Sequence, residues 1–293
     1  MVYKKTTGEI IFDICNYTFM FLLIVITLYP CYYVAVASVS DPVKVFATKG
    51  LLFTPKGFSL SSYAEVLRSS QIWYGYRNTL LYVTTGAVLS VLLTVSAAFG
   101  LTRRTLPGKN VLMFLIMFTM YFHGGLIPTY LVVKSVGLLD SPLIMILINA
   151  VVTYNLIITV SYFRNMPYEL EEAAKIDGAG DYTVLFKIML PLAKPIIAVI
   201  SLYYMVSLWN DFMTSLFYLS DRKLFPLQMI LREILIQNNK TSGMEMGSAD
   251  DAQAYAENLK YAIIVVSTLP ILCVYPFIQR YFVKGVMIGA VKG

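Results

Sequence analysis

A row of polar side chains runs through the apolar segment 196–216, where this sequence could do chemistry. Its members recur every three or four residues, with Asn210 beside them: Ser201, Tyr204, Ser207, Asp211 and Ser215. Residues at this spacing share one face of an α-helix. A carboxylate in an apolar helix of this kind costs about 2 to 3 kcal/mol unless water or a partner receives it. We therefore predict that this face lines an aqueous path; the alternative for Asp211 is a hydrogen bond to a neighbouring helix end.

Further polar and aromatic side chains lie in two other apolar segments. They are Asn149, Thr153, Tyr154 and Asn155 in segment 141–163, and Asn78 and Tyr82 in segment 78–101. Aromatic faces suit the apolar faces of sugar rings, and amides and hydroxyls suit sugar hydroxyl groups. We predict that Asn149, Tyr154 and Asn78 contribute to the path, although tyrosine is also a common anchor at a membrane surface.

The chain shows no enzyme signature. It has no HExxH or GxSxG sequence and no GxxxxGK[ST] phosphate loop, and its one histidine, His123, stands apart from any metal-ligand pattern. We expect no catalytic residue, no metal and no cofactor on this chain, so any energy source must come from a partner. His123 could pair with Asp211 as a proton relay, but a lone histidine in an apolar segment more often makes an interhelical hydrogen bond.

The elements that position these residues are membrane-spanning helices. Hydrophobic residues make up 58% of the chain and charged residues 14%, and the mean hydropathy is +0.68, which indicates an integral membrane protein. A span needs about 20 apolar residues, and runs of that length fall near 11–37, 78–101, 111–130, 141–163, 196–216 and 261–278. We predict an all-α, polytopic protein with six transmembrane helices in one domain over 1–293.

The basic residues of the short loops predict the orientation. Arg103, Arg104 and Lys109 crowd the second loop, whereas the third has only Lys134, and such an excess marks the cytoplasmic side. Both termini and the loop 164–195 are then cytoplasmic, and the long loops 38–77 and 218–260 are external. The net charge of +6 mostly reflects this orientation, and no nucleic-acid partner is expected.

The stretch EEAAKIDGAGDYTVLFKIMLP, residues 171–191, is hydrophilic at its start and is interrupted by glycine. Pro167 suits the first position of a helix, and the glutamates that follow suit its first turns. Gly178 can adopt the left-handed conformation that ends helices, and Asp181 can cap a second helix. We predict a helix, a glycine turn and a second helix, with Ala173 and Ala174 forming a flat side that another protein can approach.

The spacing in this stretch resembles the EAA motif of bacterial ABC importer permeases. Glu172, Ala173 and Ala174 are followed at the motif's spacing by Gly178 and then by Ile188, Leu190 and Pro191. WNDF at 209–212 and the tail QRYFVKGVMIGAVKG at 279–293 look like the smaller permease subunit of oligosaccharide importers of the maltose type. The segment 121–141 looks more like the branch that takes up alginate oligosaccharides.

This resemblance implies a type I importer permease fold in the bacterial inner membrane. It implies a second homologous permease, two ATPase subunits that bind ATP and Mg, and an extracytoplasmic solute-binding protein that delivers an oligosaccharide. Residues Glu172, Ala173, Ala174, Asp177 and Gly178 would couple the permease to the ATPase, and the tail, including Lys284 and Gly285, would add a second contact. The alternative function is a proton-coupled secondary transporter that uses Asp211 and His123.

Overall fold

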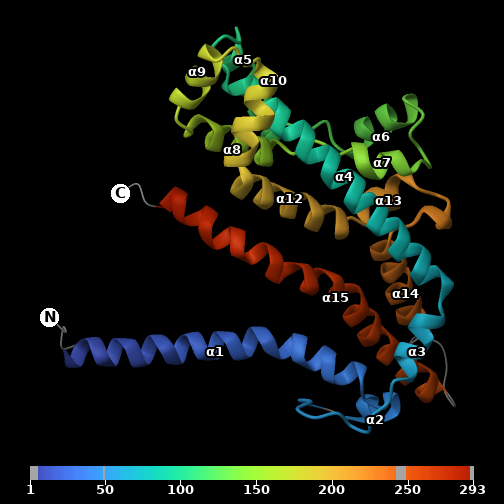
Figure 1. Cartoon of the computed structure of the whole chain (residues 1–293). Helices are drawn as coiled ribbons and strands as arrows, with labels where there is room; N and C mark the ends of the chain where they lie inside the picture. The colour runs from blue at the N-terminus through green and yellow to red at the C-terminus, as the bar shows by residue number, and fades with distance from the viewer. Residues whose placement is uncertain (1–5, 49, 242–248, 291–293) are drawn as a thin grey trace. The chain divides into compact units, whose positions relative to one another are not determined.

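A computed structural model describes residues 6–48, 50–241 and 249–290, and these residues are mostly helical (Figure 1). Within the described residues, the extended pairing is an isolated antiparallel bridge between Ser40 and Phe58. The chain divides into two compact units: unit 1 comprises residues 1–69 and 233–269, and unit 2 comprises residues 70–232 and 270–293. The all-α prediction is confirmed.

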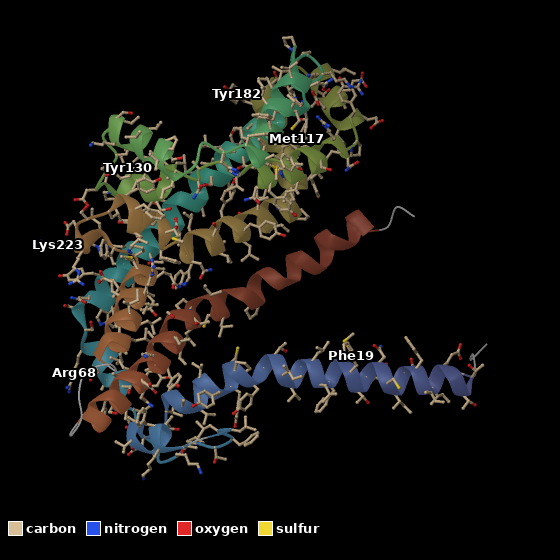
Figure 2. All side chains as sticks on the ribbon, turned by 180° about the vertical axis from the view of Figure 1, so that it is seen from behind. Phe19, Arg68, Met117, Tyr130, Tyr182 and Lys223 are labelled. Carbon is tan, nitrogen blue, oxygen red and sulfur yellow. The ribbon has the colours of Figure 1, made fainter. Side chains whose placement is uncertain are left out.

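Unit 1 begins with a long apolar helix. Its first helices are α1 (Thr7–Ser38), α2 (Pro42–Ala47) and α3 (Ser61–Arg68). Thr6 and Glu9 form a capping box that starts α1. Side chains project on all sides of this helix, as Figure 2 shows around Phe19, and α1 buries residues only at its end, Val36, Ala37 and Ser38. Most of its apolar surface is thus left for contact with lipid or another chain.

Unit 2 holds most of the remaining helices. They are α4 (Ser70–Thr102), α5 (Lys109–Tyr121), α6 (Leu126–Ser135), α7 (Pro142–Leu147), α8 (Thr153–Arg164), α9 (Glu169–Ile176), α10 (Asp181–Thr183), the π-helix η1 (Val184–Met189), α11 (Leu190–Leu192), α12 (Lys194–Trp209), α13 (Met213–Tyr218) and the 3₁₀ helix η2 (Arg222–Leu224). Two more, α14 (Leu227–Thr241) and α15 (Ala249–Ala290), belong partly to each unit.

The core of unit 2 forms around α4. This helix packs along α12 and α8, as Figure 1 shows. Gly86 lies where α12 approaches, and a Cβ at this position would lie 2.8 Å from Leu208 Cδ1. Val95, Ala98, Val160 and Ile200 are among the buried residues of the resulting cluster. Helices α4, α8 and α12 therefore form the rigid centre of the unit.

Among the described residues, three helices are long and apolar enough to cross a membrane: Thr7–Ser38, Ser70–Thr102 and Ala254–Cys273. Two bent pairs would raise the number to five if each pair is one span. These are Lys109–Tyr121 with Leu126–Ser135, bent by 116°, and Asp181–Leu192 with Lys194–Trp209, bent by 83°. The polytopic character is confirmed, and the division into six spans stays a prediction.

The structure shows three expected spans, 141–163, 196–216 and 111–130, as interrupted helices. The last of these is broken at 122–125, between α5 and α6. The first contains a break at 148–152 between α7 and α8. The second contains a break at 210–212 between α12 and α13. A continuous helix over any of the three segments is therefore wrong. At two of the breaks a side chain binds the freed backbone: the Tyr204 hydroxyl accepts from the amide of Val152, and Asp211 Oδ1 accepts from the amide of Thr214.

Candidate functional site

The segment 164–195 carries the clearest candidate site, and its first half is a short helix ended by glycine. α9 has three glutamates in its first turn, where they interact favourably with the helix dipole. Gly178 has a φ of +82°, as the sequence predicts. Its amide donates to the carbonyl of Lys175 at 3.0 Å, and the amide of Ala179 donates to that of Ala174 at 2.9 Å. This pair of bonds is a Schellman motif, which turns the chain sharply.

The second half of the segment differs from the prediction. Gly180, not Asp181, is the residue before the first helical turn, and the carboxylate of Asp181 lies 3.9 Å from Lys175 Nζ instead. Helical structure then continues through α10, η1 and α11 to Leu192, with a π-helical stretch in the middle. The predicted cap at Asp181 is wrong because the carboxylate faces a lysine of α9 and not the backbone of its own helix. Pro167 likewise lies before the helix, which begins at Glu169.

The faces of α9 correct the predicted role of the two alanines. Ala174 is buried in the core cluster of unit 2, whereas Ala173 is exposed. Only Ala173 can therefore present a flat surface to another protein, and Ala174 seats the helix on its own chain. Glu172, Asp177 and Gly178 are exposed, as a contact role requires.

Two large apolar side chains of this segment are highly exposed, although nothing in the sequence pattern distinguishes them. Ile176 is 82% exposed and Tyr182 is 80% exposed, and Figure 2 labels Tyr182 at the outer edge of its unit. Exposed apolar side chains that lie close together mark surfaces for contact with another protein. With Glu172 and Ala173 they form what we call the docking face: Glu172, Ala173, Ile176 and Tyr182.

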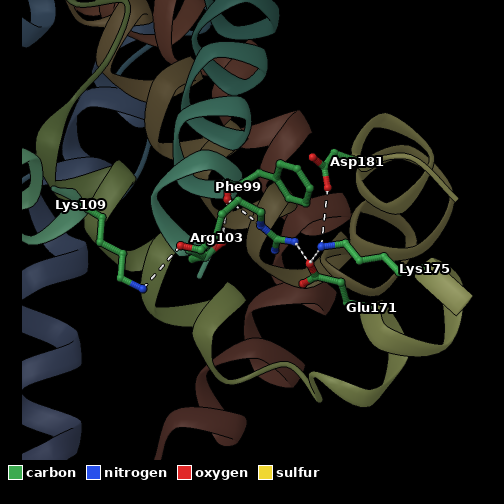
Figure 3. A network of polar contacts seen from close by, with 7 residues as sticks. Phe99, Arg103, Lys109, Glu171, Lys175 and Asp181 are labelled. Atoms are coloured by element: carbon green, nitrogen blue, oxygen red, sulfur yellow. Dashed lines mark hydrogen bonds and ion pairs between the residues drawn. The ribbon is translucent and has the colours of Figure 1, made fainter. Parts of the chain in front are cut away.

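An ion-pair network holds the opposite face of α9 (Figure 3). Arg103 Nη1 lies 2.5 Å from Glu171 Oε1, and Lys175 Nζ lies 2.8 Å from the same oxygen. Arg103 Nε also donates to the carbonyl of Phe99 at 3.2 Å, and its guanidinium lies over the Phe99 ring. In the sequence Arg103 only indicates orientation, because nothing there indicates its partner on another loop.

The charge of Glu171 is set by opposing effects. Burial acts to raise its pKa, but the hydrogen bond from Lys175 and the charges of Arg103 and Lys175 outweigh it, so the pKa lies below its ordinary value. The hydrogen bond to Glu171 in turn raises the pKa of Lys175. Glu171 and Lys175 therefore both stay charged around neutral pH.

A basic pocket of about 250 Å³ adjoins the network. Its basic lining residues are Arg103, Arg104, Lys109 and Arg164. The Arg104 guanidinium lies 3.8 Å from the centre of the Tyr168 ring, at the residue before α9. Consecutive arginines after α4 thus contact the beginning and the first turn of the same short helix.

The predicted path residues of α12 do not all share one surface. Tyr204 is buried, and its hydroxyl lies 2.7 Å from Thr94 Oγ1 and accepts from the amide of Val152 at 3.0 Å. Val152 is the last residue of the break between α7 and α8, so this bond satisfies a backbone amide that a continuous helix would have paired. Ser201 is half-buried and Ser207 is exposed.

Asp211 and Asn210 lie where α12 ends. Asp211 Oδ1 accepts from the amide of Thr214 at 3.0 Å, and Asn210 Nδ2 donates to the carbonyl of Val206 at 2.9 Å. The single helical face predicted from Ser201 to Ser215 is wrong beyond Trp209, because the carboxylate binds the first turn of α13. The alternative given for Asp211, a hydrogen bond at a helix end, describes this contact.

The remaining path candidates are spread over the unit. Asn78 Nδ2 donates to the carbonyls of Lys223 and Phe225 at 2.7 and 3.1 Å. Asn149 is exposed in the break after α7, and Tyr154 is exposed with its ring 6.3 Å from that of Tyr203. Asn78 therefore holds the 223–225 loop against α4. The side chains of Asn149 and Tyr154 remain accessible to water or lipid.

Two further candidates lie elsewhere. His123 is exposed in the turn between α5 and α6, and no described contact joins it to Asp211. Lys284 and Gly285 lie in the last part of α15, which is helical, but their surroundings are outside the residues whose side chains are described.

Comparison with known proteins agrees with the motif. The family described as "binding-protein-dependent transport system inner membrane component" matches residues 72–288. The polygalacturonan/rhamnogalacturonan transport system permease protein YtcP of Bacillus subtilis is 43% identical, covering 97% of this chain and 99% of its own. Protein LplC of Bacillus subtilis is 40% identical, covering 99% and 97%.

A solved structure is also similar. It comes from the crystal structure of a bacterial ABC transporter involved in the import of the acidic polysaccharide alginate. Its matching chain has a TM-score of 0.88 and 32% identity, with 96% of this chain and 100% of that chain covered. The matched family spans most of this sequence and contains the whole EAA segment. The chain belongs to the family of inner membrane components of binding-protein-dependent transport systems.

Proposed function

We propose that this chain moves an acidic oligosaccharide across the inner membrane and takes its driving motion from an ATPase seated on the docking face. The chain is the permease subunit of a sugar ABC importer. The observation that carries the coupling proposal is the division of α9 into two faces. Glu171 and Ala174 hold the helix to its own chain, while Glu172, Ala173 and Ile176 point away from it.

The docking face has the chemistry that a protein groove needs. Ile176 and Tyr182 supply apolar area for burial, Ala173 permits close approach, and Glu172 supplies a charge at the rim. Gly178 fixes the angle between α9 and the helical segment that follows, which carries Tyr182. Asp177, exposed at the end of α9, borders the same surface.

The assembly follows from the family. An importer permease of this kind works with a partner permease, an ATPase and a solute-binding protein. We propose one copy of this chain, one homologous permease and two ATPase subunits, with ATP and Mg bound by the ATPases. The tail at Lys284 and Gly285 would make a second contact with them. Both termini and the docking face would be cytoplasmic, consistent with the basic residues Arg103, Arg104 and Lys109 in the loop after α4.

The proposed substrate class comes from two similar proteins. One carries the name of a polygalacturonan/rhamnogalacturonan transport system and the other belongs to an importer of alginate. Polygalacturonan and alginate are both polymers of uronic acids. We propose that Ser201, Ser207, Asn149 and Tyr154 contribute hydroxyl, amide and aromatic groups to half of the path.

Reconstituted transport tests this function. Proteoliposomes would contain this chain, its partner permease and the ATPase, with the solute-binding protein added outside. We expect ATP-dependent uptake of short uronic-acid oligosaccharides, inhibition by vanadate and little uptake of neutral malto-oligosaccharides. Uptake driven by a pH gradient without ATP would contradict the proposal and favour the proton-coupled alternative, which the family assignment does not support.

A further inference from the structure

Two arginine side chains in the turn after α4 contact the beginning of α9. Ala174 seats α9 in the core, and the helix also packs against η1. Towards α4, the described contacts are Arg103 with Glu171 and Arg104 with Tyr168. Because the arginines are adjacent in the turn after α4, any shift of α9 acts directly on the end of that helix.

We infer that the Arg103–Glu171 ion pair is the joint through which the docking helix drives α4, which makes Arg103 and Glu171 positioning residues for coupled transport. The inference rests on the proposed docking of α9 by the ATPase. The joint differs from the EAA contacts, because Glu171 and Arg103 face the inside of this chain. Neither residue belongs to the docking face.

The burial of the pair suits it to this role. The side chains of Arg103 and Glu171 are only 12% and 10% exposed, and the guanidinium is also fixed by the carbonyl and ring of Phe99. An ion pair held in this way keeps one geometry, and removal of one partner leaves a poorly solvated charge. Lys175 is 42% exposed. Its ion pair with Glu171 is therefore screened by water and contributes less to holding α9 in place than the Arg103 pair does.

α4 can carry the movement over a long distance. Its 33 residues span roughly 50 Å at about 1.5 Å per residue. Near its other end, Asn78 and Tyr82 donate to carbonyls in the 222–227 segment, and Thr79 Oγ1 accepts from the amide of Leu227. A displacement at Arg103 would therefore reach a segment on the opposite side of unit 2 through one rigid helix.

A double-mutant cycle tests the joint in the complete transporter. Arg103→Gln and Glu171→Gln would each be made alone and together, with Lys134→Gln as a matched charge-removal control on the exposed end of α6. The readouts are the amount of ATPase that co-purifies and the amount of sugar transported per ATP hydrolysed. The second readout is independent of how much complex assembles.

We expect each single variant to keep the ATPase bound but to lower sugar transported per ATP about tenfold. The double variant should be no worse than either single variant, because both remove the same contact. Arg103→Lys, which keeps the charge, should recover part of the loss, and Lys134→Gln should match the wild type.

Unchanged transport per ATP in both single variants would overturn the inference. This holds even if crosslinking from position 182 confirms that the ATPase docks on α9, so the two proposals can fail separately. Additive losses in the double variant would also overturn it, since they would show two separate roles. If a single variant does not assemble, Glu171→Asp provides the milder test. It retracts the carboxylate by one methylene, and full coupling in this variant would contradict the joint.

Discussion

The hydroxyl of Tyr204 lies 2.7 Å from Thr94 Oγ1 and accepts a hydrogen bond from the amide of Val152. It thereby joins α12, α4 and the break before α8 in the centre of unit 2. Tyr204→Phe removes the acceptor of a partly buried amide, which costs about 1 to 3 kcal/mol. We expect a lower thermal unfolding temperature of the purified protein, while the transported sugar stays the same.

Tyr17→Phe, on the exposed surface of α1, is the control for loss of a tyrosine hydroxyl. A changed preference among oligosaccharides in Tyr204→Phe, with unchanged unfolding temperature, would show that Tyr204 contacts substrate.

Gly178 provides a prediction with a nearby matched control. Gly178 has a φ of +82°, whereas Gly180 has a φ of −74°, and a Cβ at either position meets no atom within 4 Å. Gly178→Val therefore carries a backbone cost of about 1 to 2 kcal/mol that Gly180→Val lacks. We expect the first variant to insert but lose binding-protein-stimulated ATP hydrolysis and uptake, and the second to retain both.

Equal activity of the two valine variants would show that the angle of the turn does not matter for coupling. Gly178→Asn should be milder than Gly178→Val, because asparagine tolerates the left-handed conformation.

The Glu171 network predicts how coupling responds to pH. The pKa of Glu171 is lowered, so its stabilising contribution is complete above its ordinary value of about 4.3 and is lost as pH falls through the depressed value. The pKa of Lys175 is raised, so its contribution is complete below about 10.4 and is lost as pH rises through the elevated value. Sugar transported per ATP should therefore be constant between about pH 6 and 9.

The ratio of sugar transported to ATP hydrolysed is measured because uptake alone would also reflect the pH dependence of the ATPase. A steep change in the ratio near pH 7 would mean that a different titrating group controls coupling.

Asp211 can be tested by separating its charge from its hydrogen bond. Asp211→Asn retains an oxygen that can accept from the amide of Thr214, whereas Asp211→Leu loses it. We expect near wild-type transport and stability for the asparagine variant and a loss of about 1 kcal/mol of stability for the leucine variant. Strong loss of uptake in Asp211→Asn, with normal stability, would show that the carboxylate charge acts in the path.

Local chemistry explains which features could be predicted from the sequence. The turn at Gly178 depends on one residue type and its neighbours, so the motif predicts its left-handed backbone. The end of α12 could not be predicted from periodicity, because the spacing of polar residues continues past the point where Asp211 turns to the backbone of α13. The burial of Ala174 and the pairing of Glu171 depend on α4 and on the turn that follows it, which lie far away in the sequence.

The central claim, that segment 164–195 seats the ATPase, is tested most directly by site-specific photo-crosslinking in the assembled transporter. Tyr182 and Tyr121 are 80% and 79% exposed, so replacing each with a photoreactive phenylalanine analogue gives a matched pair of probes. We predict a crosslink from position 182 to the ATPase subunit and none from position 121. A crosslink to the ATPase from position 121, or its absence from position 182 in a complex that transports sugar, would contradict the account.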